Sequence, residues 1–187
     1  MPDAGPGPGY SKENDMTVKR IELATESRLN EIFRPGDFLD CYAVAILPPD
    51  RPLPEILQYV LIEMPGWARM LMRLRDRIVG FFGIKTTKEL PQNNSFRKSV
   101  AVGDHIGFMK IRSMSEQEII VGEDDSHLDF RVSLRREPGE AGLVSLATLV
   151  HRHNLIGRLY LALIMPFHKL IVKSRLAAAA RHFSEQG

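Results

Sequence analysis

The chain has 187 residues, of which 44% are apolar and 26% are charged, and its formal net charge is +2. These values are typical of a soluble globular protein, and the nearly balanced charge argues against a nucleic-acid partner. The lone cysteine, Cys41, excludes an internal disulfide framework and a cysteine-based zinc site. It fits a reducing compartment, so we expect a cytoplasmic protein. No motif for a cofactor is present in the sequence, and none is expected.

Residues 1–16 are rich in proline and glycine and then polar, and they lack the apolar core of a secretory signal. We expect a disordered tail over residues 1–16 and a single domain over residues 17–187. The most apolar stretch, residues 155–172, contains an arginine, a lysine and a proline. Because charges near the middle of a membrane span are costly, we expect no transmembrane segment.

The sequence of the first half of the chain predicts strands that alternate with helical segments. A strand is expected around residues 18–23, and a short helical turn before Phe33. Residues 37–47 are rich in β-branched and aromatic side chains and end at a pair of prolines, which is typical of a strand. A helix is expected from Pro54 to the break at residues 64–66.

The next segment is the clearest amphipathic helix in the chain. Its apolar side chains fall on one face at helical spacing, and a glycine follows where the helix is expected to end. They are Trp67, Met70, Leu71, Leu74, Ile78, Val79, Phe81 and Phe82. An apolar face of this size predicts that the helix packs in the core or at an interface. Residues 85–102 are polar and predict a long loop.

From Gly103 the apolar period changes to two, which predicts a meander of strands. These strands are expected at residues 105–114, 118–123, 127–136 and 143–152. Pairing Phe130 with Thr148 gives one continuous apolar face across the last two strands. The same register places His127 opposite His151.

The longest apolar segment comes last. Asn154 is a good N-cap, so a helix is expected over residues 154–182, and Pro166 predicts a kink inside it. The element order predicts an α+β fold: a curved antiparallel sheet packed on a long, kinked C-terminal helix, with two helices after the first strand.

Several distinctive motifs lie between residues 38 and 181. They are Trp67…Leu71…Leu74-Arg75-Asp76-Arg77, Phe82-Gly83, residues 121–132, residues 150–154, residues 157–160 and Pro166-Phe-His168. Together they resemble an uncharacterised bacterial family that is catalogued only as a domain of unknown function. In some members the domain follows a Rossmann-type NAD(P)-binding half. The resemblance supplies no catalytic residues.

The element order is also similar to the helix-grip fold of START-like and pollen-allergen-like lipid-binding proteins, a superfamily that includes polyketide cyclases. The resemblance implies a curved sheet around the C-terminal helix, with an apolar cavity between them. That superfamily usually has seven strands, whereas five are clear here. Residues 18–23 and part of the loop over 85–102 are candidates for the other two.

Polar residues near the meander suggest two kinds of site. His127, Asp129 and His151 could bind zinc or iron, whereas turn chemistry and a solvent-exposed strand face explain the same pattern. His151 and His153 could form an acid–base pair, or they could fix the corner between the sheet and the last helix. The structural explanation is the more common one for both motifs.

Three further features bear on function. Asp40 could point into a cavity with Arg131 as its charge partner, or it could lie in water at a strand end. Trp67 and the methionines and aromatics of the helices could line an apolar pocket or could be plain core. The basic C-terminal helix could lie on an anionic membrane or could be docked on its own sheet.

Three functions follow as hypotheses. The first is a binding protein that holds a hydrophobic or amphipathic small molecule between the sheet and the C-terminal helix. The second is a cyclase- or isomerase-like enzyme that uses His127, Asp129, Arg131 and His151 in the same cavity. The third is a module that docks on a separate reductase or forms a homodimer.

Overall fold

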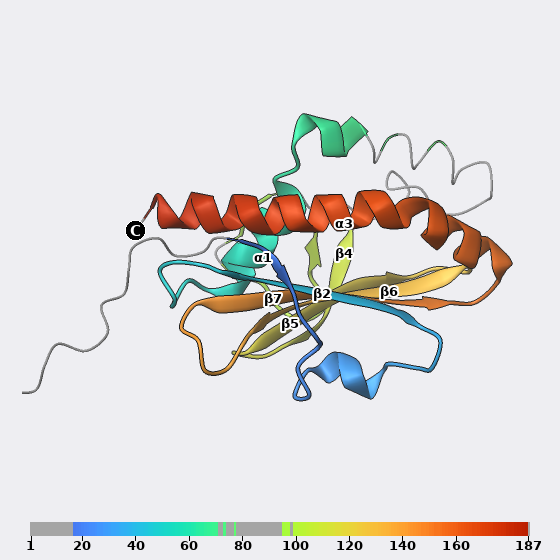
Figure 1. The fold of residues 1–187 in the computed structure, drawn as a ribbon, viewed down its shortest axis with the longest axis horizontal. Coiled ribbons are helices and arrows are strands. Elements are labelled where there is room, and N and C mark those ends of the chain that lie inside the picture. Colours follow the sequence, from blue (N-terminus) through green and yellow to red (C-terminus); the bar gives the residue numbers. More distant parts are fainter. Residues whose placement is uncertain (1–16, 71–72, 74–76, 78–94, 98, 187) are drawn as a thin grey trace, which may run out of the picture.

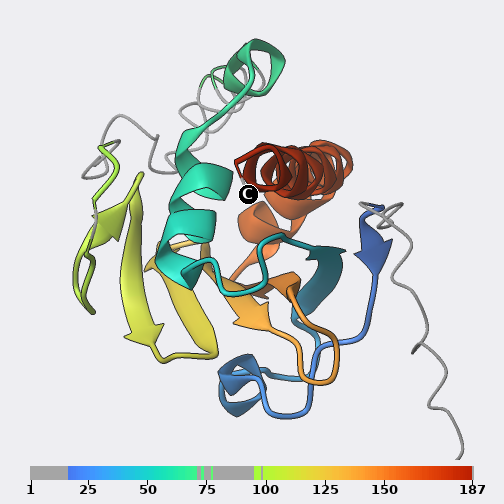
Figure 2. The ribbon, with the colours of Figure 1, turned by 90° about the vertical axis from the view of Figure 1, so that its left-hand side faces the viewer.

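The computed structural model describes residues 17–70, 73, 77, 95–97 and 99–186. These form one seven-stranded antiparallel sheet in the order β1-β2-β7-β6-β5-β4-β3. Helices α1 and α3 cover one face, and the short 3-10 helix η1 lies against the other (Figures 1 and 2). The expected α+β class, with a long C-terminal helix on an antiparallel sheet, is confirmed.

The element bounds are close to the predicted ones. The strands are β1 Lys19–Arg20, β2 Phe38–Ala45, β3 His105–Ile106, β4 Met109–Met114, β5 Glu118–Asp124, β6 Leu128–Arg136 and β7 Leu143–Arg152. The helices are η1 Arg28–Glu31, α1 Leu53–Ile62 and α3 Leu155–Ser184. Residues 66–70, 73 and 77 are also helical. The tail predicted at 1–16, most of the helix predicted after Trp67 and residues 85–94 of the predicted loop lie outside the described residues.

The two strands missing from the sequence prediction have different origins. One is β1, which comes from the predicted strand at 18–23. The other arises because the strand expected at 105–114 is a hairpin, in which Ile106 pairs with Met109. Gly107 has a φ of 60°, a conformation that glycine adopts readily, and it turns the chain between β3 and β4.

The pairing of β6 with β7 differs from the predicted register by two residues. Phe130 lies opposite Val150 rather than Thr148, and His151 lies opposite Asp129 rather than His127. The β6–β7 loop contains two glycines with positive φ, and its conformation sets the register. Because side chains alternate with a period of two, the predicted apolar face is unchanged.

The main core lies between the sheet and its two covering helices. The second half of α3 is held there by Val172, Leu176, Ala179, Ala180 and Phe183. Its first half is bent away from this line (Figure 1), as Pro166 within the helix leads us to expect. Before Val172, only Gly157 and Leu161 of α3 are buried. The second half of α3 is therefore packed more tightly on the sheet than the first half.

A smaller core lies on the opposite face of the sheet, which we call the outer face. Leu29 of η1 packs there on Cys41, Ile120, Ala147 and Leu149. A buried carboxylate, Glu118, fixes η1 in place. It accepts hydrogen bonds from Ser27 Oγ at 2.6 Å, from the Arg28 backbone N–H at 2.9 Å and from Ser133 Oγ at 2.6 Å.

Candidate functional site

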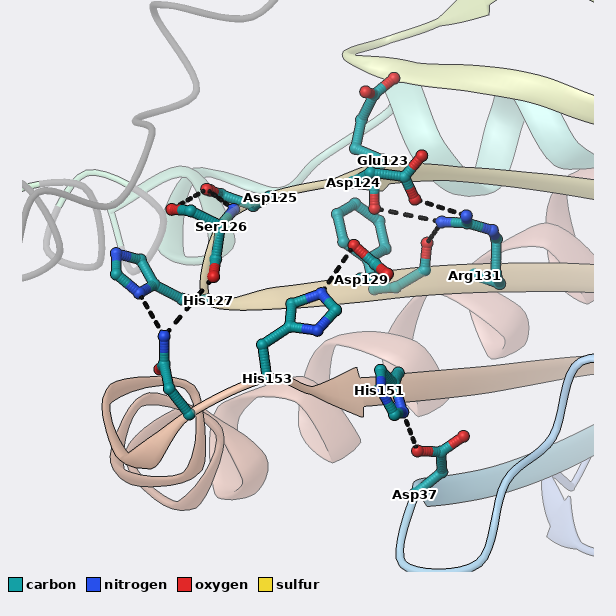
Figure 3. Close-up of polar contacts among 12 residues, drawn as sticks. Asp37, Glu123, Asp124, Asp125, Ser126, His127, Asp129, Arg131, His151 and His153 are labelled. Atoms are coloured by element: carbon teal, nitrogen blue, oxygen red, sulfur yellow. Dashed lines mark hydrogen bonds and ion pairs between the residues drawn. The ribbon is translucent and has the colours of Figure 1, made fainter.

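Most of the predicted site residues lie near one end of the outer face, where β6, β7 and the start of α3 meet (Figure 3). His151 Nδ1 lies 2.6 Å from Asp37 Oδ1, and His153 Nε2 lies 3.1 Å from Asp129 Oδ1. The two imidazole rings are 5.1 Å apart between centroids. The pair of histidines predicted at this corner is thus present, and each ring has its own carboxylate.

His127 belongs to a different contact at the same corner. Its Nδ1 lies 3.0 Å from the side-chain nitrogen of Asn154, whose Oδ1 accepts the Gly157 backbone N–H at 3.0 Å. Asn154 is therefore the N-cap of α3, as predicted. His127, Asp129 and His151 have separate partners and do not converge, and among the described residues no group of three or more His, Cys, Asp or Glu is placed to hold a metal.

Gly157 lets α3 start directly against the β5–β6 turn. A Cβ at this position would lie 2.2 Å from the carbonyl oxygen of His127, which accepts the His153 backbone N–H at 3.0 Å. Only glycine leaves room for this close approach.

Gly157→Ala should therefore lower the free energy of unfolding by about 1–3 kcal/mol through backbone displacement. The measurement is urea unfolding followed by circular dichroism. Gly66→Ala is the matched control, since nothing lies within 4 Å of the point that its Cβ would occupy. Equal stability of the two variants would contradict the role given to Gly157.

Arg131 does not pair with Asp40, contrary to the sequence hypothesis. Its guanidinium contacts Asp124 Oδ1, and Arg112 Nη2 lies 3.0 Å from Asp124 Oδ2. Burial alone would raise the pKa of Asp124, but the hydrogen bond and charge of Arg131, together with Arg112, hold that pKa below its usual value. These ion pairs connect β4, β5 and β6, and their side chains are partly exposed. This arrangement suits a structural role.

Asp40 lies on the opposite face of the sheet, under α3. It is 3% exposed, and its Oδ1 lies 3.4 Å from His168 Nε2, near the outer limit of a hydrogen bond. Its Oδ2 is buried without a partner, and so is the Oγ1 of Thr148. Asp40 and Thr148 are direct cross-strand partners on β2 and β7. Two buried oxygen atoms, on directly paired residues, therefore lack hydrogen-bond partners, which is rare in folded proteins.

The walls around these two groups are apolar. Leu128, Val150 and Leu161 form a buried cluster. Partly buried side chains pack on this cluster: Phe38, Phe130, Tyr160 and Met165. The Phe38 ring meets the His168 ring edge-on at 6.4 Å between centroids. We call Asp40, Thr148 and His168, with this surround, the Asp40 site.

Sequence reasoning found one of these three polar residues. The sequence hypothesis names Asp40 as a residue that could point into a cavity, with Arg131 as its charge partner. His168 appeared only within a family motif, and Thr148 only as a register partner. Asp129, Arg131 and His151, which the cyclase-like hypothesis places in one cavity, lie on the outer face of the sheet, opposite the face that carries Asp40.

Trp67 does not join the Asp40 site. It is 37% exposed, in a helical segment beyond α3 on the side away from the sheet (Figure 2). Met70 and Phe167 are likewise exposed rather than lining a pocket. A separate shallow hollow lies at the β6–β7 loop beside Pro49 and Arg136, and none of the predicted site residues lines it.

Helix α3 is the one helix of the described residues that is long and apolar enough to cross a membrane, by length and composition. The sequence expectation was that no segment qualifies. However, Leu176, Ala179, Ala180 and Phe183 belong to the main core. The second half of α3 therefore cannot enter a bilayer while the domain stays folded.

Together, the sheet and α3 define an α+β protein of helix-grip-like architecture, with buried Asp40 and Thr148 under the C-terminal helix. A family model described as "Protein of unknown function (DUF2867)" matches residues 32–175. The match covers most of the chain, and the protein belongs to this family. None of the curated proteins and none of the solved structures compared with the chain matches it.

Proposed function

We propose that the protein binds an amphipathic small molecule between the first half of α3 and the sheet, with the polar head of the ligand at the Asp40 site. The observation that carries this proposal is that two cross-strand partners each have a buried polar atom without a partner, Asp40 Oδ2 and Thr148 Oγ1. A carboxylate oxygen accepts, and a hydroxyl both donates and accepts. A ligand hydroxyl or amine can satisfy both atoms at once.

The surroundings suit the rest of such a ligand. Buried and half-buried apolar side chains from β2, β6, β7 and α3 flank the two polar groups. The first half of α3 buries only Gly157 and Leu161 before Val172, so little packing opposes its displacement. A ligand can therefore enter by moving this half of the helix while the second half stays in the core.

The test is binding of N-phenyl-1-naphthylamine, an apolar fluorophore with a single N–H donor. Its emission should rise on addition of the protein. Its single N–H can be shared between Asp40 Oδ2 and Thr148 Oγ1. Thr148→Val removes the hydroxyl and keeps the shape, so it should lower the affinity by about three- to tenfold. The same variant should raise the free energy of unfolding by about 1 kcal/mol, because an unsatisfied buried hydroxyl is replaced by a methyl group.

Thr148→Ser is the matched control, since it keeps the hydroxyl and should retain most of the affinity. Native mass spectrometry of protein from its host should show a bound mass that Thr148→Val loses. If the probe does not bind, or binds Thr148→Val as tightly as the wild type, then ordered water at these atoms is the better explanation and the proposal fails.

A further inference from the structure

The first half of α3 presents a stripe of large apolar side chains to solvent. Leu155 is 68% exposed, Leu159 62%, Leu163 48%, Phe167 41% and Leu170 56%. Their spacing of four, four, four and three residues places them on one side of the helix. The buried residues of the same half, Gly157 and Leu161, fall on the opposite side. We call this set, residues 155, 159, 163, 167 and 170, the α3 stripe.

The exposure of this stripe is unusual for a helix of its composition. The most apolar 18-residue window of α3 has a mean hydropathy of 1.6, and only 17% of it is buried. A core helix of that hydropathy is mostly buried, and large exposed apolar patches on soluble proteins mark interaction sites. The α3 stripe is therefore expected to be an interaction surface.

Charges around the stripe point to the nature of that partner. Helix α3 contains no aspartate or glutamate between its first and last residues. Arg158 and Lys169 are exposed along one edge of the stripe. Trp67, Arg69, Met70, Arg73 and Arg77 are also exposed. The helical segment at residues 66–70 lies on the side of the sheet that α1 and α3 cover (Figure 2). Exposed apolar side chains and cations thus occur together along the first half of α3.

We infer that this side of the protein docks on an anionic membrane surface, with the α3 stripe in the boundary between headgroups and acyl chains. Helices that lie in this plane combine a large apolar face with flanking lysines and arginines. The stripe extends over roughly 22 Å of helix, and a fluid bilayer can cover such a convex ridge without a matching groove. The flanking cations select acidic headgroups.

This membrane contact is independent of the proposed ligand site. The Asp40 site lies on the side of α3 that faces the sheet, whereas the α3 stripe lies on the opposite side. The two can be disabled separately. The helix lies on the membrane and does not cross it, because its second half remains in the main core.

The test is co-sedimentation of the full chain with large vesicles. Wild type should sediment with vesicles of phosphatidylcholine that contain one quarter phosphatidylglycerol, and at least about tenfold more weakly with pure phosphatidylcholine. Leu159→Glu with Leu163→Glu should reduce binding to the acidic vesicles at least about tenfold. Arg158→Glu with Lys169→Glu should abolish the preference for acidic vesicles.

The matched control is Ile32→Glu with Phe33→Glu, which changes two exposed apolar residues near η1 and should leave sedimentation unchanged. The proposal is overturned if wild type stays in the supernatant with both kinds of vesicle, or if the Leu159/Leu163 pair binds like wild type. It is also overturned if light scattering shows a dimer that this pair dissolves, since a second copy then covers the stripe. A marked loss of thermal stability in the Leu159→Glu/Leu163→Glu variant would show that another part of the chain covers the α3 stripe. That result would also overturn the proposal.

Discussion

Replacing Glu118 with alanine should lower the free energy of unfolding by about 3–5 kcal/mol. The carboxylate is 3% exposed and accepts hydrogen bonds from Ser27 Oγ, the Arg28 backbone N–H and Ser133 Oγ. Truncation leaves these three donors without their acceptor, and each such group in a low-polarity site costs about 1–2 kcal/mol. It also frees η1, whose Leu29 covers the outer core. Urea unfolding measures the loss.

Cys41 gives a second, local readout of the same change. It is 2% exposed beneath η1, and burial raises its pKa to about 12. The thiol is therefore protonated and shielded at pH 8, and it reacts with a thiol reagent only when the structure opens. In Glu118→Ala, labelling should be at least about tenfold faster than in wild type, because η1 is no longer held down.

Two controls separate this effect from a general loss of charge. Glu118→Gln keeps a carbonyl acceptor of the same shape and should lose less stability than the alanine variant. Glu116→Ala removes an exposed carboxylate two residues away and should stay within about 0.5 kcal/mol of wild type. A loss below about 1 kcal/mol in Glu118→Ala would show that water replaces the carboxylate at little cost.

Strands with unbroken alternation could be predicted from the sequence almost to the residue. β7 was expected at residues 143–152 and lies at Leu143–Arg152. The hairpin of β3 and β4 was missed, although Gly107 was a readable signal, because the apolar pattern continues across it. The β6–β7 register was missed by two residues, because it depends on the loop conformation, which the apolar pattern does not encode.

The Asp40 site was only partly predictable for a related reason. The sequence left two alternatives for Asp40, a place facing a cavity or a strand end in water, and the structure buries the residue. His168 is 128 residues away and reaches Asp40 only because α3 crosses the sheet at this point. Glu118 gave no signal, because a lone glutamate at a strand start resembles a solvated one. Local patterns define faces, whereas the partners of a buried polar group depend on how distant elements cross.

Replacing Asp40 with asparagine should change stability in the direction opposite to that of Glu118→Ala. Asp40 is as buried as Glu118, but one of its oxygens has no partner and the other has a single contact at 3.4 Å. Asparagine has nearly the same shape and carries no charge, so it relieves the burial of a carboxylate that has only one weak contact. We expect the free energy of unfolding to rise by about 1–2 kcal/mol in urea unfolding without ligand.

The same variant should bind N-phenyl-1-naphthylamine about tenfold more weakly, because a hydrogen bond to a carboxylate is roughly twice as strong as one to a neutral oxygen. Asp129→Asn is the matched control. Its carboxylate pairs with His153 on the outer face, so both stability and probe affinity should stay close to wild type. A destabilised Asp40→Asn would instead make Asp40 and His168 a structural pair. A bound ligand adds more stability the tighter it binds. An Asp40→Asn variant that is more stable without the probe and less stabilised by it would therefore indicate that Asp40 serves ligand binding.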